Sequence, residues 1–218
     1  MTGDQVVLID GSGAEADGEI ASLDRSGAEV SVLAVRPAGD PGPAIWLGVC
    51  AVRAERIAWI AEKAGELAVA TLALVRSERT QAFRAADGAP ERLERLAREA
   101  AKQSGGTRWP RCEGPIDFAR ALEPGGAGAE GVGGVEGAEG KARFFFDASG
   151  AAFPVSLAGG AASILIGPEG GWTEGERAAA AAAGWTAVRL PAATLRTETA
   201  AVAAVVLTRA ALERGEAS

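Results

Sequence analysis

The 218-residue sequence contains neither histidine nor tyrosine. An imidazole base, a histidine metal ligand, a Ser-His-Asp relay and a tyrosine general acid are therefore all excluded. Catalytic chemistry in this chain has to come from Asp, Glu, Lys, Arg, Ser, Thr, Cys or the backbone.

Cysteine is also scarce, because Cys50 and Cys112 are the only two and lie far apart in the chain. Two isolated cysteines without histidine make neither a disulfide framework nor a zinc site, so no metal centre is expected. We expect both thiols to be buried as small apolar groups.

Long apolar runs are missing as well. No stretch reaches the roughly 18 consecutive apolar residues of a membrane span, and the first residues lack the basic and apolar regions of a secretory signal. We therefore expect no membrane partner and a cytoplasmic location.

Positive charge is in deficit, since 29 acidic residues face 22 basic ones for a net charge of −7. This balance argues against a generic polyanion binder and against DNA as a partner. Residues 76–111 are the exception, with nine basic and five acidic groups. Arginine forks bind phosphate oxygens, so this segment could face an RNA backbone. It could equally be the solvated face of a helix with its own ion pairs.

The apolar pattern changes near residue 50. Before it, β-branched runs bounded by Gly, Asp and Pro predict a small antiparallel sheet or barrel, at residues 6–9, 30–35 and 44–47. After it, helical spacing alternates with short strands, at residues 55–67, 70–75, 91–103, 143–146, 163–166, 174–183, 185–190 and 197–214. That alternation predicts an α/β domain with a mostly parallel sheet. Residues 124–140 hold eight glycines and predict a flexible surface loop.

A glycine-rich segment, residues 167–171, stands between a predicted strand and a predicted helix. Open α/β sheets bind ligands at such strand ends. The sequence of this segment matches neither a Walker loop nor a dinucleotide-binding motif. It is also compatible with a plain tight turn. Residues 195–199 form a polar cluster that opens the last helix, where the threonines could act only as caps.

Taken together, residues 164–173, 188–191 and 195–200 closely resemble the C-terminal signature of the bacterial small-subunit ribosomal RNA uridine N3-methyltransferases, a family of the SPOUT superfamily. Three upstream segments agree. Residues 59–69 resemble the family's Lys-Ala-Thr-Glu-Leu-Gly-Val helix, residues 77–79 its Ser-Glu-Arg, and residues 99–105 its Ala-Glu-Gln-Ser helix end. The motifs keep the family's order and spacing across about residues 50–213.

The resemblance implies a C-terminal trefoil-knotted SPOUT domain at residues 51–218, preceded by a truncated PUA-like, RNA-binding β domain at residues 1–50. It implies an S-adenosylmethionine-dependent enzyme of rRNA processing and ribosome biogenesis. The substrate would be N3 of a uridine in 16S ribosomal RNA, free or in the small ribosomal subunit. A homodimer is implied, in which the partner completes each active site. Three loops would hold S-adenosylmethionine, through Gly167, Glu169, Gly170, Gly171, Leu190, Ala192 and Leu195.

The catalytic residues implied are few. The uridine imide has to lose its proton, and either Glu198 or Glu169 could accept it, or Arg196 could stabilise the charge that develops on the base carbonyls. We favour Arg196, because its guanidinium is permanently cationic, and name Glu198 as the second catalytic candidate. Arg79, Lys102, Gln103 and Arg108 are the candidates for RNA phosphate and sugar contacts.

The sequence departs from the family at several points. Members normally begin with a further strand and helix, and Gly65, Ala68 and Lys102 replace Thr, Gly and Glu. The shortened start and the acidic balance motivate an alternative, a non-catalytic RNA-binding or ribosome-assembly protein that retains the knotted cofactor fold.

Overall fold

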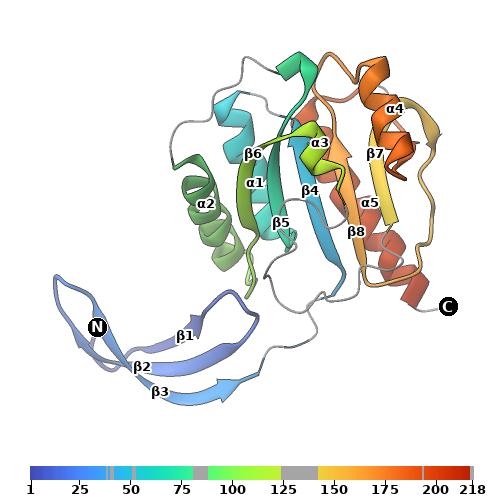
Figure 1. Cartoon of the computed structure of the whole chain (residues 1–218). Helices are drawn as coiled ribbons and strands as arrows, with labels where there is room; N and C mark the ends of the chain where they lie inside the picture. The colour runs from blue at the N-terminus through green and yellow to red at the C-terminus, as the bar shows by residue number, and fades with distance from the viewer. Residues whose placement is uncertain are drawn as a thin grey trace.

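The computed structural model describes residues 1–37, 39, 42–50, 53–80, 88–123, 142–192 and 194–216. The glycine-rich stretch at residues 124–140, predicted to be a flexible loop, lies outside the described residues. The described part consists of a three-stranded sheet that extends away from a larger α/β body (Figure 1).

The N-terminal sheet is antiparallel, in the order β1 (Gln5–Ile9), β2 (Glu15–Leu23), β3 (Ala28–Arg36). An antiparallel sheet was predicted here, but its middle strand β2 was missed because that strand is acidic and nearly without large apolar residues. Arg36 compensates this charge through ion pairs to Glu15 and Asp17, at 2.6 Å each. Both faces of the sheet leave apolar side chains in solvent, among them Val7, Leu23, Val32 and Val35.

The larger sheet has six parallel strands in the order β6 (Arg111–Asp117), β5 (Thr71–Arg76), β4 (Ala44–Cys50), β8 (Ala161–Ile166), β7 (Ala142–Ala152), β9 (Thr186–Arg189). The predicted mostly parallel α/β sheet is therefore confirmed.

One strand belongs to a different sheet than predicted. The run at residues 44–47 was assigned to the N-terminal sheet, but it forms β4 at the centre of the large sheet, between β5 and β8. The reason is burial on both faces: Ile45, Leu47 and Val49 point to one side, while Trp46 and Cys50 point to the other. A nearly continuous apolar run is typical of such a strand.

Helices cover both faces of this sheet (Figure 1). On one face, α1 (Ala54–Glu66), α2 (Ala89–Gln103) and α5 (Thr197–Glu216) enclose the larger apolar core. On the other, α3 (Phe118–Ala121) and α4 (Glu174–Ala182) enclose a second core that contains Trp46, Phe145, Trp172 and Trp185. The long C-terminal helix buries Ala201, Ala204, Val205 and Leu212, as its composition predicted.

The packing of α1 on α2 explains a departure from the related family. A Cβ atom at Gly65 would lie 2.1 Å from the carbonyl oxygen of Ala97 in α2. No side chain fits at that distance, so these two helices approach each other through the glycine. Both cysteines are buried and free, as expected.

Candidate functional site

A cavity of about 250 Å³ opens at the carboxyl end of β8, beside the middle of β7, and three loops of the C-terminal half line it. The first is the predicted glycine loop, residues 167–171, and the others are residues 190–192 and 194–197. Residue 193, between the last two, lies outside the described residues. Six of the seven predicted cofactor residues line the cavity: Gly167, Glu169, Gly171, Leu190, Ala192 and Leu195. Gly170, the seventh, lies between two of them in the chain.

Glycines are required in this loop for two separate reasons. Gly171 has a φ of +69°, which L side chains rarely adopt, and its N–H closes a turn on the Pro168 carbonyl at 2.8 Å. A Cβ atom at Gly167 would come within 2.9 Å of the Trp172 ring. Trp172 is itself fixed, since it is buried and donates to the Phe146 carbonyl at 2.9 Å.

The helix after the loop begins with a capping box. The Thr173 hydroxyl accepts from the N–H of Glu176 at 3.2 Å, and the Glu176 carboxylate accepts from the N–H of Thr173 at 2.9 Å. The other carboxylate oxygen of Glu176 accepts from the backbone N–H of Glu78 at 2.9 Å. One buried carboxylate thus joins the start of α4 to the turn η1 (Glu78–Thr80) that follows β5.

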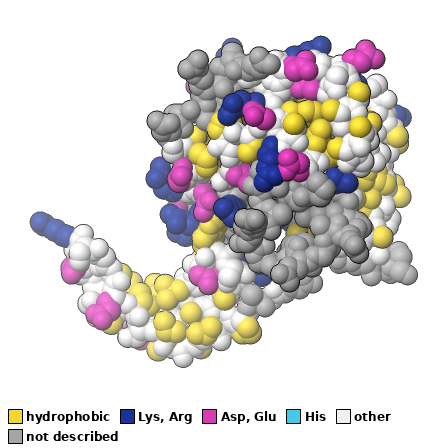
Figure 2. Space-filling model, viewed as in Figure 1, with side chains coloured by type: hydrophobic (Ala, Val, Ile, Leu, Met, Phe, Trp, Pro, Cys, Tyr) yellow, Lys and Arg dark blue, Asp and Glu magenta, His cyan; other side chains and the backbone are white. Residues whose placement is uncertain are grey.

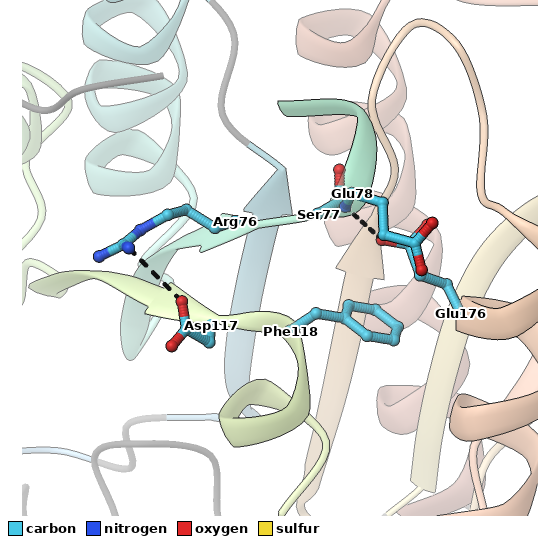
Figure 3. A pocket seen from close by; sticks show the side chains of 6 residues that line it. All are labelled: Arg76, Ser77, Glu78, Asp117, Phe118 and Glu176. Atoms are coloured by element: carbon cyan, nitrogen blue, oxygen red, sulfur yellow. Dashed lines mark hydrogen bonds and ion pairs between the residues drawn. The ribbon is translucent and has the colours of Figure 1, made fainter. Parts of the chain in front are cut away.

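Figure 3 shows this junction beside a second cavity, of about 440 Å³. The Phe118 side chain points toward Glu176, and Arg76 pairs with Asp117 at 3.5 Å on the opposite side. Behind the cavity, the Phe118 ring packs against Trp172, with 5.2 Å between the ring centroids. The two cavities are therefore separated by an aromatic pair that belongs to the site's framework.

Arg79, predicted to contact RNA, is placed at the glycine loop. Its guanidinium donates to the carbonyl oxygen of Gly170 and, at 3.1 Å, to that of Gly171. Among the described residues, no backbone N–H of a strand or helix donates to these two carbonyls, so the guanidinium supplies their donors.

Arg56, which the sequence did not single out, lies against two predicted site residues. Its guanidinium contacts the carboxylate of Glu169 in the glycine loop, and its Nε lies 3.7 Å from the Glu198 carboxylate in α5. The hydrogen bond that Arg56 donates to the Glu169 carboxylate raises the pKa of Arg56. Glu198 is directed to this cation, and it is absent from the residues that line the cofactor cavity.

Asp147 gives the cavity a second charged pair. Burial raises the pKa of this carboxyl, but hydrogen bonds from Ser149 and the Arg177 guanidinium, 2.8 Å away, outweigh burial and hold the pKa below its usual range. Asp147 is therefore ionised at neutral pH and compensated by Arg177.

The remaining predicted residues are more exposed. Arg196 immediately precedes α5, between the lining residues Leu195 and Thr197, and within the described part of the chain its side chain forms no ion pair. Thr197 ties α5 to the glycine loop, because its hydroxyl donates to the Gly167 carbonyl at 3.4 Å. Lys102 and Gln103 are exposed at the end of α2.

Arg108 lies at the junction between the N-terminal sheet and the body. Isolated bridges join it to Gly11 and Ser12, and its guanidinium donates to the Gly39 carbonyl at 3.4 Å. A cavity of about 330 Å³ opens at this junction. The structure thus does not bring all four RNA candidates together, since Arg79 lies at the glycine loop.

Comparisons with known proteins agree with this architecture. The RNA methyltransferase domain family matches residues 40–209. A probable rRNA-methyltransferase from Porphyromonas gingivalis has 27% sequence identity and a TM-score of 0.82, over 98% of this chain and 87% of that one. A ribosomal RNA small subunit methyltransferase E from Neisseria gonorrhoeae, solved bound to S-adenosyl methionine, has 25% identity and a TM-score of 0.82, over 97% and 85% of the two chains. The search of curated proteins gave no match.

Because the family match spans well over half of its length, the chain belongs to the RNA methyltransferase domain family. The predicted relationship to the ribosomal RNA methyltransferases is confirmed. Among the described helices, none has the length and apolar character needed to cross a membrane.

Proposed function

We propose that this chain is an S-adenosylmethionine-dependent methyltransferase that methylates N3 of a uridine in 16S ribosomal RNA. The observation that carries the proposal is the cavity itself, because the three loops assigned to the cofactor from sequence converge on one space. The relative from Neisseria gonorrhoeae, bound to S-adenosyl methionine, supports the choice of cofactor.

The residues of the cavity suit this cofactor. Ile166, Leu190 and Leu195 offer apolar surface to an adenine ring, and the glycines let a ligand approach the loop backbone. The ionised Asp147 carboxylate also lines the cavity, paired with the Arg177 guanidinium. When bound, S-adenosylmethionine supplies an electrophilic methyl group.

Arg196 is the residue that we propose to act on the uridine. Its exposed, permanently charged guanidinium can stabilise negative charge on the base carbonyls as the imide proton leaves. Both carboxylates pair with Arg56, but Glu169 lines the cavity and Glu198 is absent from its lining. We therefore propose Glu169 as the proton acceptor to test first, with Glu198 as the second.

For RNA binding we propose the outer face of α2. Arg92, Arg95, Arg98 and Lys102 are all exposed at helical spacing along it, with Gln103 at its end. Figure 2 shows Lys and Arg side chains gathered at the edge of the body where α2 lies in Figure 1. Glu94, by contrast, is turned inward and accepts from the N–H of Cys112 at 3.3 Å. Glu91 and Glu99 stay exposed on α2, and Glu99 pairs with Arg98 and Lys102, so the four basic residues leave the helix surface with a net positive charge.

The remaining parts of the proposal concern architecture. We propose that the body built on the six-stranded sheet, which begins with β4 at Ala44, forms a trefoil-knotted SPOUT domain. We also propose that the β1–β3 sheet is a PUA-like RNA-binding unit, and that the protein acts as a cytoplasmic homodimer. The hydrogen bond from the Thr197 hydroxyl to the Gly167 carbonyl supports the knotted arrangement, because it places the start of α5 against the glycine loop. Arg108 supports cooperation of the sheet with the body, since it bridges the two.

The experiment is methyl transfer to small ribosomal subunits that lack the modification, read by mass spectrometry of the released nucleosides. The proposal predicts N3-methyluridine only with active protein and S-adenosylmethionine, and no transfer to fully methylated subunits. Binding of cofactor and RNA without any methylated product would instead favour the non-catalytic RNA-binding or assembly protein.

A further inference from the structure

Arg56 occupies a position where a cation is locally unfavourable. It lies in the first turn of α1, two residues after the helix begins at Ala54. The N-terminus of a helix carries partial positive charge, so acidic residues are favoured there and basic ones are not. Arg56 therefore needs compensation from elsewhere in the fold.

The compensation comes from two segments distant in sequence. Glu169 belongs to the glycine loop, 113 positions away, and Glu198 belongs to the first turn of α5. The Arg56 side chain is partly buried, with 26% of it exposed. One cation thus stands between the cofactor loop and the helix that begins beside it.

Glu198 depends on this cation. Its side chain is only 16% exposed, and its Oε2 atom is buried without a hydrogen-bond partner among the described residues. A buried carboxylate is costly unless charge or hydrogen bonds compensate it. Arg56 is the cation that the structure provides for it within ion-pair distance.

We propose that Arg56 is a positioning residue that fixes the glycine loop against α5 by serving as the common counter-charge of Glu169 and Glu198. Without it, two carboxylates that share one site are left to repel each other. The loop then moves away from α5, and the cofactor cavity loses its shape. This inference rests on the proposed function for its cofactor readout, but not for its loop readout.

The experiment compares the Arg56→Gln, Arg56→Lys, Glu198→Gln and Arg56→Gln/Glu198→Gln variants. Arg53→Gln is the matched control, because Arg53 is an exposed arginine at the same helix end that forms no ion pair within the described residues. Two quantities are measured: amide hydrogen exchange of peptides that cover the glycine loop, without cofactor, and the Kd for S-adenosylmethionine.

Arg56→Gln is expected to speed exchange in the loop and to raise the Kd about tenfold, the size of a typical coupling between contacting charged groups. Arg56→Lys retains the charge and restores most of both quantities. The double variant does so as well, since the repulsion disappears with the second carboxylate.

The proposal is overturned if Arg56→Gln leaves loop exchange and Kd at wild-type values. It is also overturned if the double variant is as defective as Arg56→Gln alone, because Arg56 would then act by packing and not by charge. Failure of the wild-type protein to bind S-adenosylmethionine would count against the proposed function, while the exchange rates would still decide the role of Arg56.

Discussion

The guanidinium of Arg79 donates a 3.1 Å hydrogen bond to the carbonyl oxygen of Gly171, 92 positions further along the chain. A second bond from the same group reaches the Gly170 carbonyl. A residue that sequence motifs assigned to RNA is thereby placed on the backbone of the proposed cofactor loop.

The first prediction concerns this contact. Arg79→Gln removes charged donors from two loop carbonyls, so the Kd for S-adenosylmethionine should rise about five- to tenfold by calorimetric titration. Arg76→Gln is the control, because Arg76 lies at the end of β5 but pairs with Asp117 away from the loop. If Arg79 serves RNA instead, the cofactor Kd stays unchanged and the slope of log RNA affinity against log salt falls by about 0.7.

The second prediction concerns the buried carboxylate that joins η1 to α4. Glu176→Ala leaves the N–H groups of Glu78 and Thr173 without their acceptor, which should lower the free energy of unfolding by about 1–3 kcal/mol in urea titrations. Glu174→Ala, in the same helical turn but exposed, should cost only about 0.3–1 kcal/mol. Equal losses from the two variants would contradict the role of Glu176 as a bridge.

The third prediction concerns two glycine-to-alanine substitutions that should change the stability of the protein in opposite directions. Alanine usually stabilises a helix relative to glycine by about 0.5–1 kcal/mol, and Gly175→Ala in α4 should do so because its Cβ meets only ordinary contacts. Gly65→Ala should instead destabilise the protein by about 1–3 kcal/mol, since the Ala97 carbonyl would be 2.1 Å away. Thermal unfolding of the two variants measures both signs, and stabilisation by Gly65→Ala would refute the close approach of α1 and α2.

The fourth prediction concerns pH. Burial raises the pKa of the Cys50 thiol well above its ordinary range and that of Cys112 to about 12. Above a pH of about 8.5 the unfolded thiols lose protons that the folded ones keep, so stability should fall as the pH rises from there. Urea unfolding under reducing conditions at pH 7, 8.5 and 10 measures this loss. The Cys50→Ala/Cys112→Ala variant should show a flatter dependence, and an identical slope in both proteins would be inconsistent with the raised pKa values.

Local sequence signals were sufficient for much of the fold. The helices predicted at residues 55–67 and 174–183 are specified by neighbours in the chain, and both are found, as α1 and α4. The glycine loop was located for the same reason, since a strand, a turn and a cap follow one another directly.

Properties that depend on distant partners were not available from the sequence. Strand β2 lacks an apolar pattern because pairing with β1 and β3 and the charge of Arg36 stabilise it. The sheet to which β4 belongs depends on the strands that pair with it, and the apolar pattern of a single strand does not identify its partners. Arg56 carried one weak signal, a basic residue in the first turn of a helix, and its meaning emerges only with Glu169 and Glu198 beside it.

The most direct test of the account is the comparison of wild type with Arg196→Ala in two assays, S-adenosylmethionine titration and methyl transfer to undermethylated small ribosomal subunits. The account predicts that the wild type produces N3-methyluridine, and that Arg196→Ala binds the cofactor with a similar Kd but loses at least about a hundredfold in turnover. Unchanged turnover in Arg196→Ala would contradict the role of this guanidinium, and a wild-type protein that binds no cofactor would contradict the central claim.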